Sequence, residues 1–412
     1  MRYGVIGEHL KHSFSKEIHE RIADYTYDIC EIEPDKLGTF LTEAEFEGIN
    51  VTIPYKEKAI PYLYYISDSA KKIGAINTVV NKEGKLYGYN TDYMGMRALI
   101  LKNGIDLAGK KALILGKGGT AKTGHSVLSD LGVREILHVG RPFEEPDVLY
   151  EDVYALHSDA DFILNTTPVG MFPKNEGKII DISKFPKLMG LIDVVYNPLR
   201  TNLVLDAMER GIKTEAGLYM LVSQAVFASE FFTEKKYGDE ICKKVFKEIL
   251  NSKENIALIG MPSSGKTTVG KYLATLMNRE LVDTDDEIVK KIGMDIPSYF
   301  AKYGEAEFRR VESEVIAEVG KQNGIIIATG GGAVLKRENV RNLKQNSRIY
   351  FLNRDLSLLT PTSSRPLSSD IEALKKRFEE RYDIYKASAD VELAANGTVE
   401  EVAKAIMEEF YR

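Results

Sequence analysis

Short apolar runs recur along the chain, and each one ends in glycine or in a polar turn. The clearest are YGVIG, KALIL, DFILN, GLIDVVY, IALIG, GIIIA and RIYFL, and the stretches between them carry apolar residues at helical spacing. Uninterrupted apolar runs of this length are typical of strands that are buried on both faces. Their alternation with helices predicts an α/β protein with parallel sheets.

Two of these strands run directly into glycine-rich turns, at Gly116 and at Gly260. A strand, a glycine-rich turn and a helix together form the start of a nucleotide-binding sheet, so we expect two such sheets with a boundary between them. The segment 234–254 is charged and carries apolar residues along one side at helical spacing. We interpret it as a closing helix of the first part, with a free linker as the alternative.

The expected domain organisation follows from these boundaries. Residues 1–95 should form an α/β substrate-binding domain, to which residues 203–235 return, and residues 96–202 a dinucleotide-binding domain of the Rossmann type. Residues 236–251 are the closing helix or linker. Residues 252–412 should form a P-loop domain with a parallel sheet.

The composition fits a folded, soluble chain. Of the 412 residues, 44% are hydrophobic and 28% are charged, which is enough apolar material for packed cores in two or three domains. The net charge of −6, with both signs interspersed, argues against binding to nucleic acid or to anionic membranes. The 2 cysteines form no CxxC pair, which argues against disulfides and zinc. Because no signal peptide or run of about 18 apolar residues is visible, we expect a cytoplasmic protein.

The turn at Gly260 has the sequence GMPSSGKT, which matches the pattern GxxxxGK[ST] between a strand and a helical stretch. In this setting backbone N–H groups surround a phosphate, the lysine reaches the β and γ phosphates, and the next hydroxyl binds magnesium. The motif predicts a phosphate-binding nucleotide site, made by Gly260, Ser263, Ser264, Gly265, Lys266, Thr267 and Thr268.

Further polar clusters follow later strands of this last third. Asp283 and Asp285 lie at a strand end, where one carboxylate can serve magnesium and the other a substrate hydroxyl, although a solvated acidic turn explains them equally well. A triple glycine after GIIIA permits close backbone approach to a ligand. The serine-rich segment around Arg365 has the character of a lid that brings charge to a phosphoryl group.

In this order, GxxxxGKT, VDTD, EFRRVE, GGGA, SRPL and RYxxY resemble the shikimate kinase family over residues 252–412. The resemblance implies ATP and Mg²⁺ as cofactors, with Thr267 and Asp283 at the metal and Asp285 at the reacting hydroxyl. It implies three residues around shikimate, Arg309, Gly331 and Arg381. It also implies two cations that stabilise the transferring phosphoryl group, Lys266 and Arg365.

One departure from the family concerns adenine. The family usually has an arginine that packs on adenine about two turns before the lid, whereas this chain has Leu358 there and Arg354 slightly earlier. We therefore expect adenine to be held differently.

The turn at Gly116 has the sequence GKGGTA after the strand KALIL, which meets GxGxxA between a strand and a helix. Flavin, nicotinamide and methyl-donor folds share this motif, so the cofactor stays open on this evidence. The next strand ends at Arg141, about 25 residues after the first glycine, where NAD sites usually carry an acidic residue. Arg141 favours the 2′-phosphate of NADP, with a plain surface arginine as the alternative.

Four segments of the first part carry hydroxyl, amide, lysine and aspartate side chains: HSFS at 12–15, NVTIPYK at 50–56, GAINT at 74–78 and GYNTD at 88–92. Such a set suits a small polyol. A lysine held by an aspartate can deliver a proton to a forming alkoxide as hydride arrives, which makes Lys56 and Asp92 a candidate catalytic pair. The simpler explanations are helix caps for Ser13 and Ser15 and an ordinary ion pair for Lys56 and Asp92.

Together with NTTPVGM, DVVYNP and GxxMxxxQA, these segments resemble the shikimate dehydrogenase family over residues 1–235. The resemblance implies that Lys56 and Asp92 are catalytic and that substrate is held by Ser13, Ser15, Thr52, Asn77, Asp92, Tyr196 and Gln224. It implies that NADP(H) contacts Gly116, Gly118, Gly119, Thr120, Ala121, Arg141, Thr166 and Met220. Lys117, where the family has a small residue, and GRP, in place of NRT, are departures on the cofactor side.

The two resemblances meet at one metabolite, because the product of the first reaction is the substrate of the second. The sequence predicts NADPH-dependent reduction of 3-dehydroshikimate to shikimate, followed by phosphorylation of shikimate to shikimate 3-phosphate. Two alternatives stay open: a catalytically silent nucleotide- or shikimate-binding C-terminal domain, and quinate activity in the first part. The sequence indicates no oligomeric state.

Overall fold

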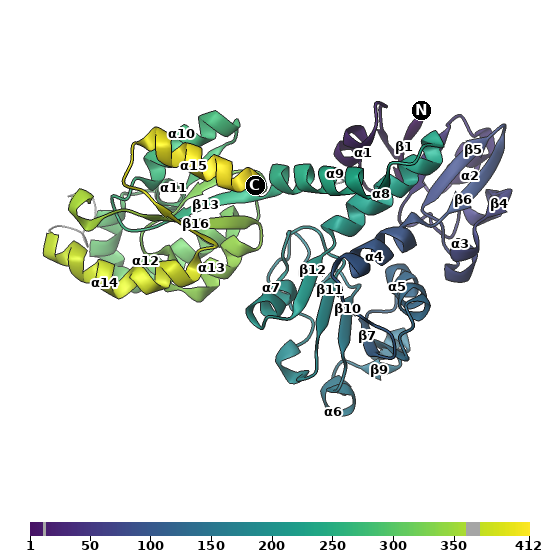
Figure 1. Ribbon diagram of the computed structural model, residues 1–412, viewed down its shortest axis with the longest axis horizontal. Helices are drawn as coiled ribbons and strands as arrows, with labels where there is room; N and C mark the ends of the chain where they lie inside the picture. Colours follow the sequence, from purple (N-terminus) through teal and green to yellow (C-terminus); the bar gives the residue numbers. More distant parts are fainter. Residues whose placement is uncertain (11–13, 360–370) are drawn as a thin grey trace. The chain divides into compact units, whose positions relative to one another are not determined.

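The computed structural model describes residues 1–10, 14–359 and 371–412. Contacts within the chain divide it into two compact units, Met1–Ile249 and Leu250–Arg412 (Figure 1). Within the described ranges, none of the helices combines the length and the apolar character that crossing a membrane requires.

The first lobe of unit 1 is built on a mixed sheet in the order β2-β1-β3-β5-β6-β4. Its strands are β1 (Tyr3–Gly7), β2 (Asp28–Glu31), β3 (Gly48–Val51), β4 (Tyr65–Ile66), β5 (Thr78–Lys82) and β6 (Lys85–Tyr89). β5 runs antiparallel to both β3 and β6, so the expected parallel arrangement does not extend to it. The reason is local: Glu83 and Gly84 both have positive φ (53° and 81°), the geometry of a two-residue hairpin turn. The helices are α1 (Ser15–Ile22), α2 (Leu37–Glu43) and α3 (Asp68–Ile73).

The second lobe of unit 1 is an all-parallel sheet in the order β12-β11-β10-β7-β8-β9. Its strands are β7 (Lys111–Leu115), β8 (Glu135–Gly140), β9 (Val148–Leu149), β10 (Phe162–Asn165), β11 (Gly190–Asp193) and β12 (Lys213–Ala216). Its helices are α5 (Gly119–Asp130), α6 (Val153–His157) and α7 (Asn202–Glu209).

This topology corrects the expected return of the chain to the first lobe at residue 203. β12 is hydrogen-bonded to β11, and Leu203 and Val204 of α7 are buried in the core of the second lobe. The chain therefore returns only at α8 (Leu218–Thr233). The apolar pattern of α7 indicates a buried face but does not say which sheet covers that face.

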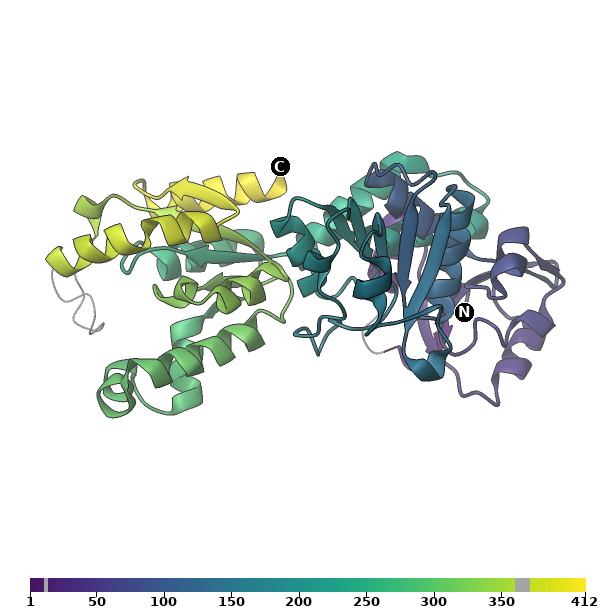
Figure 2. The same ribbon diagram turned by 90° about the horizontal axis from the view of Figure 1, so that it is seen from below.

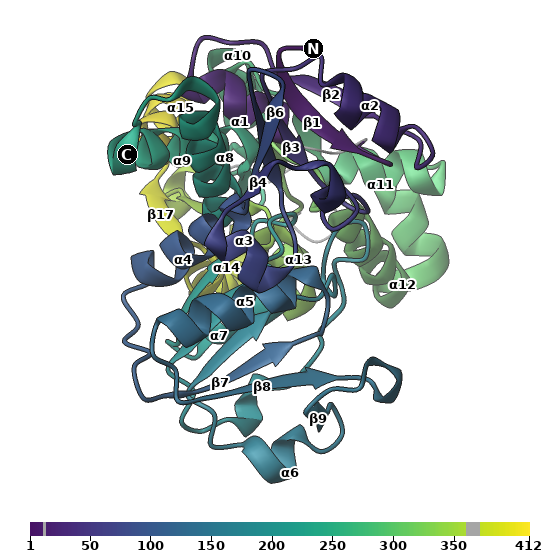
Figure 3. The same ribbon diagram turned by 90° about the vertical axis from the view of Figure 1, so that its right-hand side faces the viewer.

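α8 and α4 (Thr91–Lys102) lie against each other between the two lobes (Figures 1 and 3). Gly95 permits this contact, because a Cβ atom there would lie only 2.7 Å from the Met220 carbonyl oxygen. α9 (Gly238–Lys253) follows α8, and its residues Val245 and Ile249 are buried. Most of α9 belongs to unit 1, which ends at Ile249.

Unit 2 contains an all-parallel sheet in the order β14-β15-β13-β16-β17. Its strands are β13 (Asn255–Ile259), β14 (Leu281–Asp283), β15 (Ile326–Ala328), β16 (Ser347–Asn353) and β17 (Val391–Ala394). Its helices are α10 (Lys266–Met277), α11 (Thr284–Ile292), α12 (Ile296–Val319), α13 (Arg337–Lys344), α14 (Ile371–Ser388) and α15 (Val399–Tyr411).

Successive residues of β13 enter two separate cores of unit 2. Ile256 and Leu258 pack with α10 and α15, whereas Ala257 and Ile259 pack with α12, α13 and α14 on the other face (Figure 1). This alternation is the reason why IALI is apolar throughout. α11 and α12 lie side by side (green in Figure 2), and α12 is interrupted at Gly304, whose φ is 82°.

Candidate active sites

Lys56 and Asp92 meet at the carboxyl edge of the first sheet. Lys56 lies in the loop after β3, and Asp92 lies in the first turn of α4, which begins there because the Asn90 side chain accepts the Tyr93 N–H (3.0 Å). Lys56 Nζ lies 2.5 Å from Asp92 Oδ2, and the two side chains are 30% and 21% exposed. The ammonium is thus fixed by a carboxylate while a reactant can still reach it.

A buried amide cluster lies beside this pair. Asn77 accepts the Thr91 N–H through Oδ1 (2.6 Å) and donates through Nδ2 to Thr91 Oγ1 (3.0 Å). Gln224 of α8 brings its Oε1 within 3.5 Å of the same Asn77 and Thr91 groups. Two candidate substrate ligands that are 147 residues apart therefore share one hydrogen-bond network.

The remaining substrate candidates lie at the ends of neighbouring elements. Ser15 is the first residue of α1, which follows Phe14. Ser13 lies outside the described residues. Thr52 follows β3. Tyr196 follows β11 in the second lobe, and its ring lies 5.4 Å from that of Phe14 in the first lobe.

Burial raises the pKa of Tyr196. Its ring lies against Phe14 at the start of α1, and the neutral phenol can donate a hydrogen bond.

The glycine loop after β7 has an open surface. Gly116 has φ 100° and donates its N–H to the Val139 carbonyl (2.8 Å). A Cβ atom at Gly118 or Gly119 would have no neighbour within 4 Å, so there is space for a ligand against the backbone. α5 begins at Gly119, with Thr120 and buried Ala121 in its first turn. A helix N-terminus beneath an open loop fits a pyrophosphate.

The other cofactor candidates surround this loop. Thr166 donates its hydroxyl to the Leu115 carbonyl (2.6 Å), so its side chain lies at the end of β7. Arg141 is exposed and directly follows β8. Met220 is 9% exposed on α8.

The loop 260–265 of unit 2 takes the conformation that its glycines permit. Gly260 and Gly265 have φ of 149° and 91°, and Ser263 also has positive φ, 65°. Lys266 Nζ donates to the carbonyls of Gly260 (2.9 Å) and Met261 (2.8 Å). The lysine is therefore held over the loop, and only 5% of it is exposed. Two other candidates lie two residues before and two residues after this lysine in the sequence: Ser264, which is fully buried, and Thr268 in the first turn of α10.

Thr267 and Asp283 form the candidate metal pair. Thr267 Oγ1 donates to Asp283 Oδ2 (2.6 Å), and Asp283 Oδ1 accepts the Asp285 N–H (3.0 Å) as the cap of α11. A hydroxyl and a carboxylate beside a phosphate-binding loop are hard oxygen ligands of the kind that Mg²⁺ prefers. The donor set fits this ion.

The triple glycine after β15 is the point where the candidate shikimate residues converge. A Cβ atom at Gly330 would lie 2.7 Å from Asp285 Oδ1, and one at Gly332 would overlap the Arg309 guanidinium. The Gly331 carbonyl accepts a hydrogen bond from Arg381 Nη1 (3.1 Å) and another from the Tyr385 hydroxyl. The glycines are needed because the Asp285 carboxylate, the Pro262 ring and the Arg309 guanidinium occupy the space that side chains would fill.

Glu312 is a further residue of this cluster, and the sequence patterns assigned no role to it. It is 1% exposed and accepts a hydrogen bond from Arg309 Nη1 (2.8 Å). Burial raises the pKa of the Glu312 carboxyl, and Arg309 opposes this shift. The i, i+3 spacing of Arg309 and Glu312 was the available signal. Glu312 holds one of the two arginines in place.

Arg354 lies near the nucleotide loop. Its Nη1 donates to the Ala395 carbonyl (3.3 Å) and would lie 3.9 Å from a Cβ atom at Gly265. Leu358, at the position of the family's adenine-packing arginine, is 43% exposed. Arg365 lies outside the described residues.

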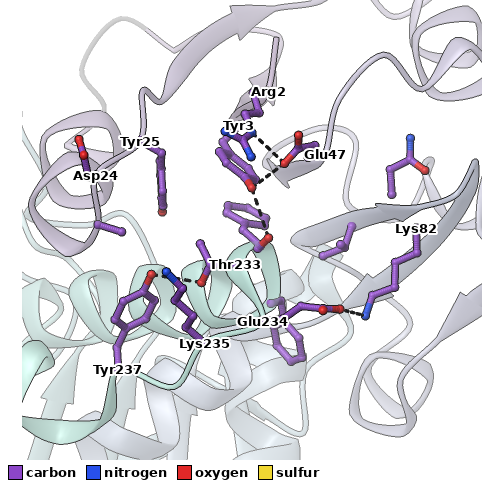
Figure 4. A pocket seen from close by; sticks show the side chains of 15 residues that line it. Arg2, Tyr3, Asp24, Tyr25, Glu47, Lys82, Thr233, Glu234, Lys235 and Tyr237 are labelled. Carbon is purple, nitrogen blue, oxygen red and sulfur yellow. Dashed lines mark hydrogen bonds and ion pairs between the residues drawn. The ribbon is translucent and has the colours of Figure 1, made fainter.

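A cavity of about 510 Å³ occupies the amino edge of the first sheet, away from these candidates (Figure 4). Tyr3, Tyr25 and Tyr237 line it, together with the ion pair between Lys82 and Glu234. The described residues that line it include none of the substrate or cofactor candidates.

Both units match known families. The shikimate dehydrogenase substrate binding domain family matches residues 5–79, and the shikimate kinase family matches residues 262–411. A shikimate dehydrogenase (NADP(+)) of Clostridium beijerinckii is 34% identical over 261 residues, which cover 59% of this chain and 96% of the relative.

Solved structures agree with this relationship. A chorismate mutase/shikimate 5-dehydrogenase fusion protein from Clostridium acetobutylicum is 34% identical with a TM-score of 0.56, over 60% of this chain and 96% of that one. A shikimate 5-dehydrogenase from Thermus thermophilus, solved with NADP(H) and shikimate, is 28% identical with a TM-score of 0.53, over 60% and 99%. The chain thus belongs to the shikimate dehydrogenase family, and its residues 262–411 form a shikimate kinase domain.

Proposed function

We propose that the chain catalyses two successive reactions, the NADPH-dependent reduction of 3-dehydroshikimate to shikimate and the ATP-dependent phosphorylation of shikimate to shikimate 3-phosphate. The observation that carries this proposal is that one chain combines the Lys56–Asp92 pair of a carbonyl reductase with a phosphate-binding loop and an acid–arginine cluster. The two families that it matches act on a common metabolite.

In the first reaction, substrate binds beside Lys56 with its hydroxyl groups on Ser15, Asn77 and Gln224. NADPH, when bound on the glycine loop, supplies the hydride to the ketone carbon. The Lys56 ammonium donates its proton to the ketone oxygen, so that a hydroxyl rather than an alkoxide forms. Asp92 orients the amine before transfer, because its Oδ2 lies 2.5 Å from Lys56 Nζ.

In the second reaction, Arg309 and Arg381 bind the carboxylate of shikimate from two sides of the triple glycine. Asp285 accepts the proton of the reacting hydroxyl, whose oxygen then bonds to the γ-phosphorus of ATP as the bond to ADP breaks. Mg²⁺ on Thr267 and Asp283 would offset phosphate charge. Lys266 supplies a further positive charge to the phosphoryl group.

Two assays on the full chain test the two assignments. NADPH consumption with 3-dehydroshikimate is measured first, and formation of shikimate 3-phosphate from added shikimate, ATP and magnesium is measured second, in a separate reaction. Lys56→Met should lower the first rate by roughly 10² to 10⁴-fold and leave the second unchanged, whereas Asp285→Asn should do the reverse. The exposed neighbours Lys58→Met and Asp286→Asn serve as matched controls. A wild-type chain that reduces no 3-dehydroshikimate, or that leaves shikimate and ATP unconverted, would refute the corresponding half.

A further inference from the structure

Two cationic residues, Lys117 and Arg141, follow the adjacent strands β7 and β8 of the second sheet. These strands pair in parallel with Leu115 opposite Val139, and the Gly116 N–H donates to the Val139 carbonyl (2.8 Å), one residue beyond the paired segment. The same register continued by two residues places Lys117 opposite Arg141. Because parallel strands end at the same edge, both side chains start from the rim of the candidate cofactor site.

The side chain of Lys117 crosses from the glycine loop to the loop after β8. Its Nζ donates a hydrogen bond to the carbonyl oxygen of Glu145, four residues beyond Arg141. Lys117 and Arg141 are both exposed, and the Arg141 guanidinium carbon lies 5.8 Å from the ring centroid of Phe143. A neutral carbonyl is a weak partner for an ammonium, so an anion can replace it at little cost.

Glu144 is an acidic residue of the loop that carries Arg141. Glu144 accepts the Arg141 N–H through Oε2 (2.8 Å), and the same oxygen lies over Gly140, 2.7 Å from where a Cβ atom would be. This carboxylate is therefore occupied by the backbone of the loop. An NAD site would instead use a carboxylate here for the ribose hydroxyls.

We propose that Lys117 and Arg141 together bind the 2′-phosphate of NADP, with Lys117 as the second cation and as a determinant of the preference for NADP over NAD. The inference rests on the proposed reductase function. A phosphate monoester carries nearly two negative charges at neutral pH and has three acceptor oxygens, so it can bond an ammonium and a guanidinium at once. Since Lys117 belongs to the glycine loop itself, this contact links the 2′-phosphate to the backbone that cradles the pyrophosphate.

Calorimetry of the full chain with two nucleotides tests the inference without catalysis. The probes are 2′,5′-ADP, which has the 2′-phosphate, and 5′-AMP, which lacks it. Lys117→Ala should weaken the binding of 2′,5′-ADP by roughly tenfold or more and leave that of 5′-AMP within about twofold. Lys110→Ala, which removes an equal charge at the opposite end of β7, should change neither affinity.

The outcomes separate this inference from the function on which it rests. If wild type binds 2′,5′-ADP and Lys117→Ala binds it equally well, the role of Lys117 is refuted while the reductase assignment stands. Equal weakening for both nucleotides would also refute it, because Lys117 would then serve the 5′-phosphate. A wild-type chain that binds neither nucleotide overturns both. The Lys117→Ala/Arg141→Ala variant should bind the two probes with nearly equal affinity.

Discussion

His19 makes the stability of unit 1 depend on pH. Its ring is fully buried and stacked on Tyr27 with centroids 3.9 Å apart, and Nδ1 lies 2.7 Å from the Tyr25 hydroxyl and 3.2 Å from Ser229 Oγ. Burial lowers the pKa of His19 from 6.5 to about 3, and a hydrogen bond with Asn50 opposes this only in part. At mildly acidic pH, His19 is therefore neutral in the folded protein and protonated in the unfolded chain.

The magnitude follows from this difference in pKa. Below pH 6.5 the unfolded chain is protonated at His19 and the folded chain is not, so the free energy of unfolding falls as pH falls, by up to about 1.4 kcal/mol per pH unit. Between pH 7 and pH 5 the loss from His19 should be about 2 kcal/mol. Asp193 acts in the opposite direction, because burial raises its pKa from 3.8 to about 6 and the folded state then gains a proton first. The contribution of His19 to the pH dependence of stability is therefore obtained by comparing His19 variants with wild type.

Urea unfolding of the full chain at pH 7 and pH 5, followed by hydrogen–deuterium exchange of peptides from residues 1–249, measures this. His19→Gln has no titrating ring and should lose about 2 kcal/mol less than wild type between the two pH values, whatever its stability at pH 7. His19→Phe, which keeps the stacking on Tyr27, is the second variant and should behave alike. If both variants and wild type lose the same free energy, to within about 0.5 kcal/mol, burial of neutral His19 is not the cause.

Three further predictions concern other parts of the chain. Glu230 accepts the N–H groups of Tyr237 (2.9 Å) and Gly238 (3.3 Å) at the start of α9. Glu230→Gln should therefore lower the free energy of unfolding by about 1 to 3 kcal/mol, measured by calorimetric melting. An unchanged melting temperature would contradict this. Glu312→Gln should raise the KM for shikimate several-fold through loss of the charge that orients Arg309, while the KM for ATP stays constant; equal effects on both would mean general disruption. Asp283→Asn should raise the magnesium concentration at half-maximal kinase rate at least tenfold, and an unshifted titration would remove Asp283 from the metal site.

Local chemistry was the part of both sites that the sequence could predict. The glycines and the lysine of GMPSSGKT predicted a tight turn after a buried strand, and the structure has it: Gly260 and Gly265 have positive φ, and the strand IALI before them is buried on both faces. The pairing of Lys56 with Asp92 was likewise predictable, since reduction of a ketone needs a held proton donor. The residue at which the chain returns to the first lobe could not be predicted, because α7 carries the same apolar periodicity whichever sheet it covers.

What escaped prediction is the set of contacts that close between distant elements. The cluster of Asn77, Thr91 and Gln224 requires α8 to lie against α4, and that approach depends on the absence of a side chain at Gly95. No spacing within the sequence encodes it, because a glycine in a helix costs stability wherever it occurs and only the neighbouring helix shows why it is tolerated. A Gly95→Ala substitution should therefore do more than add a methyl group: by separating α4 from α8 it should move Gln224 away from Asn77. Reductase activity should then fall by more than the loss of folded protein alone would explain, and kinase activity should stay unchanged.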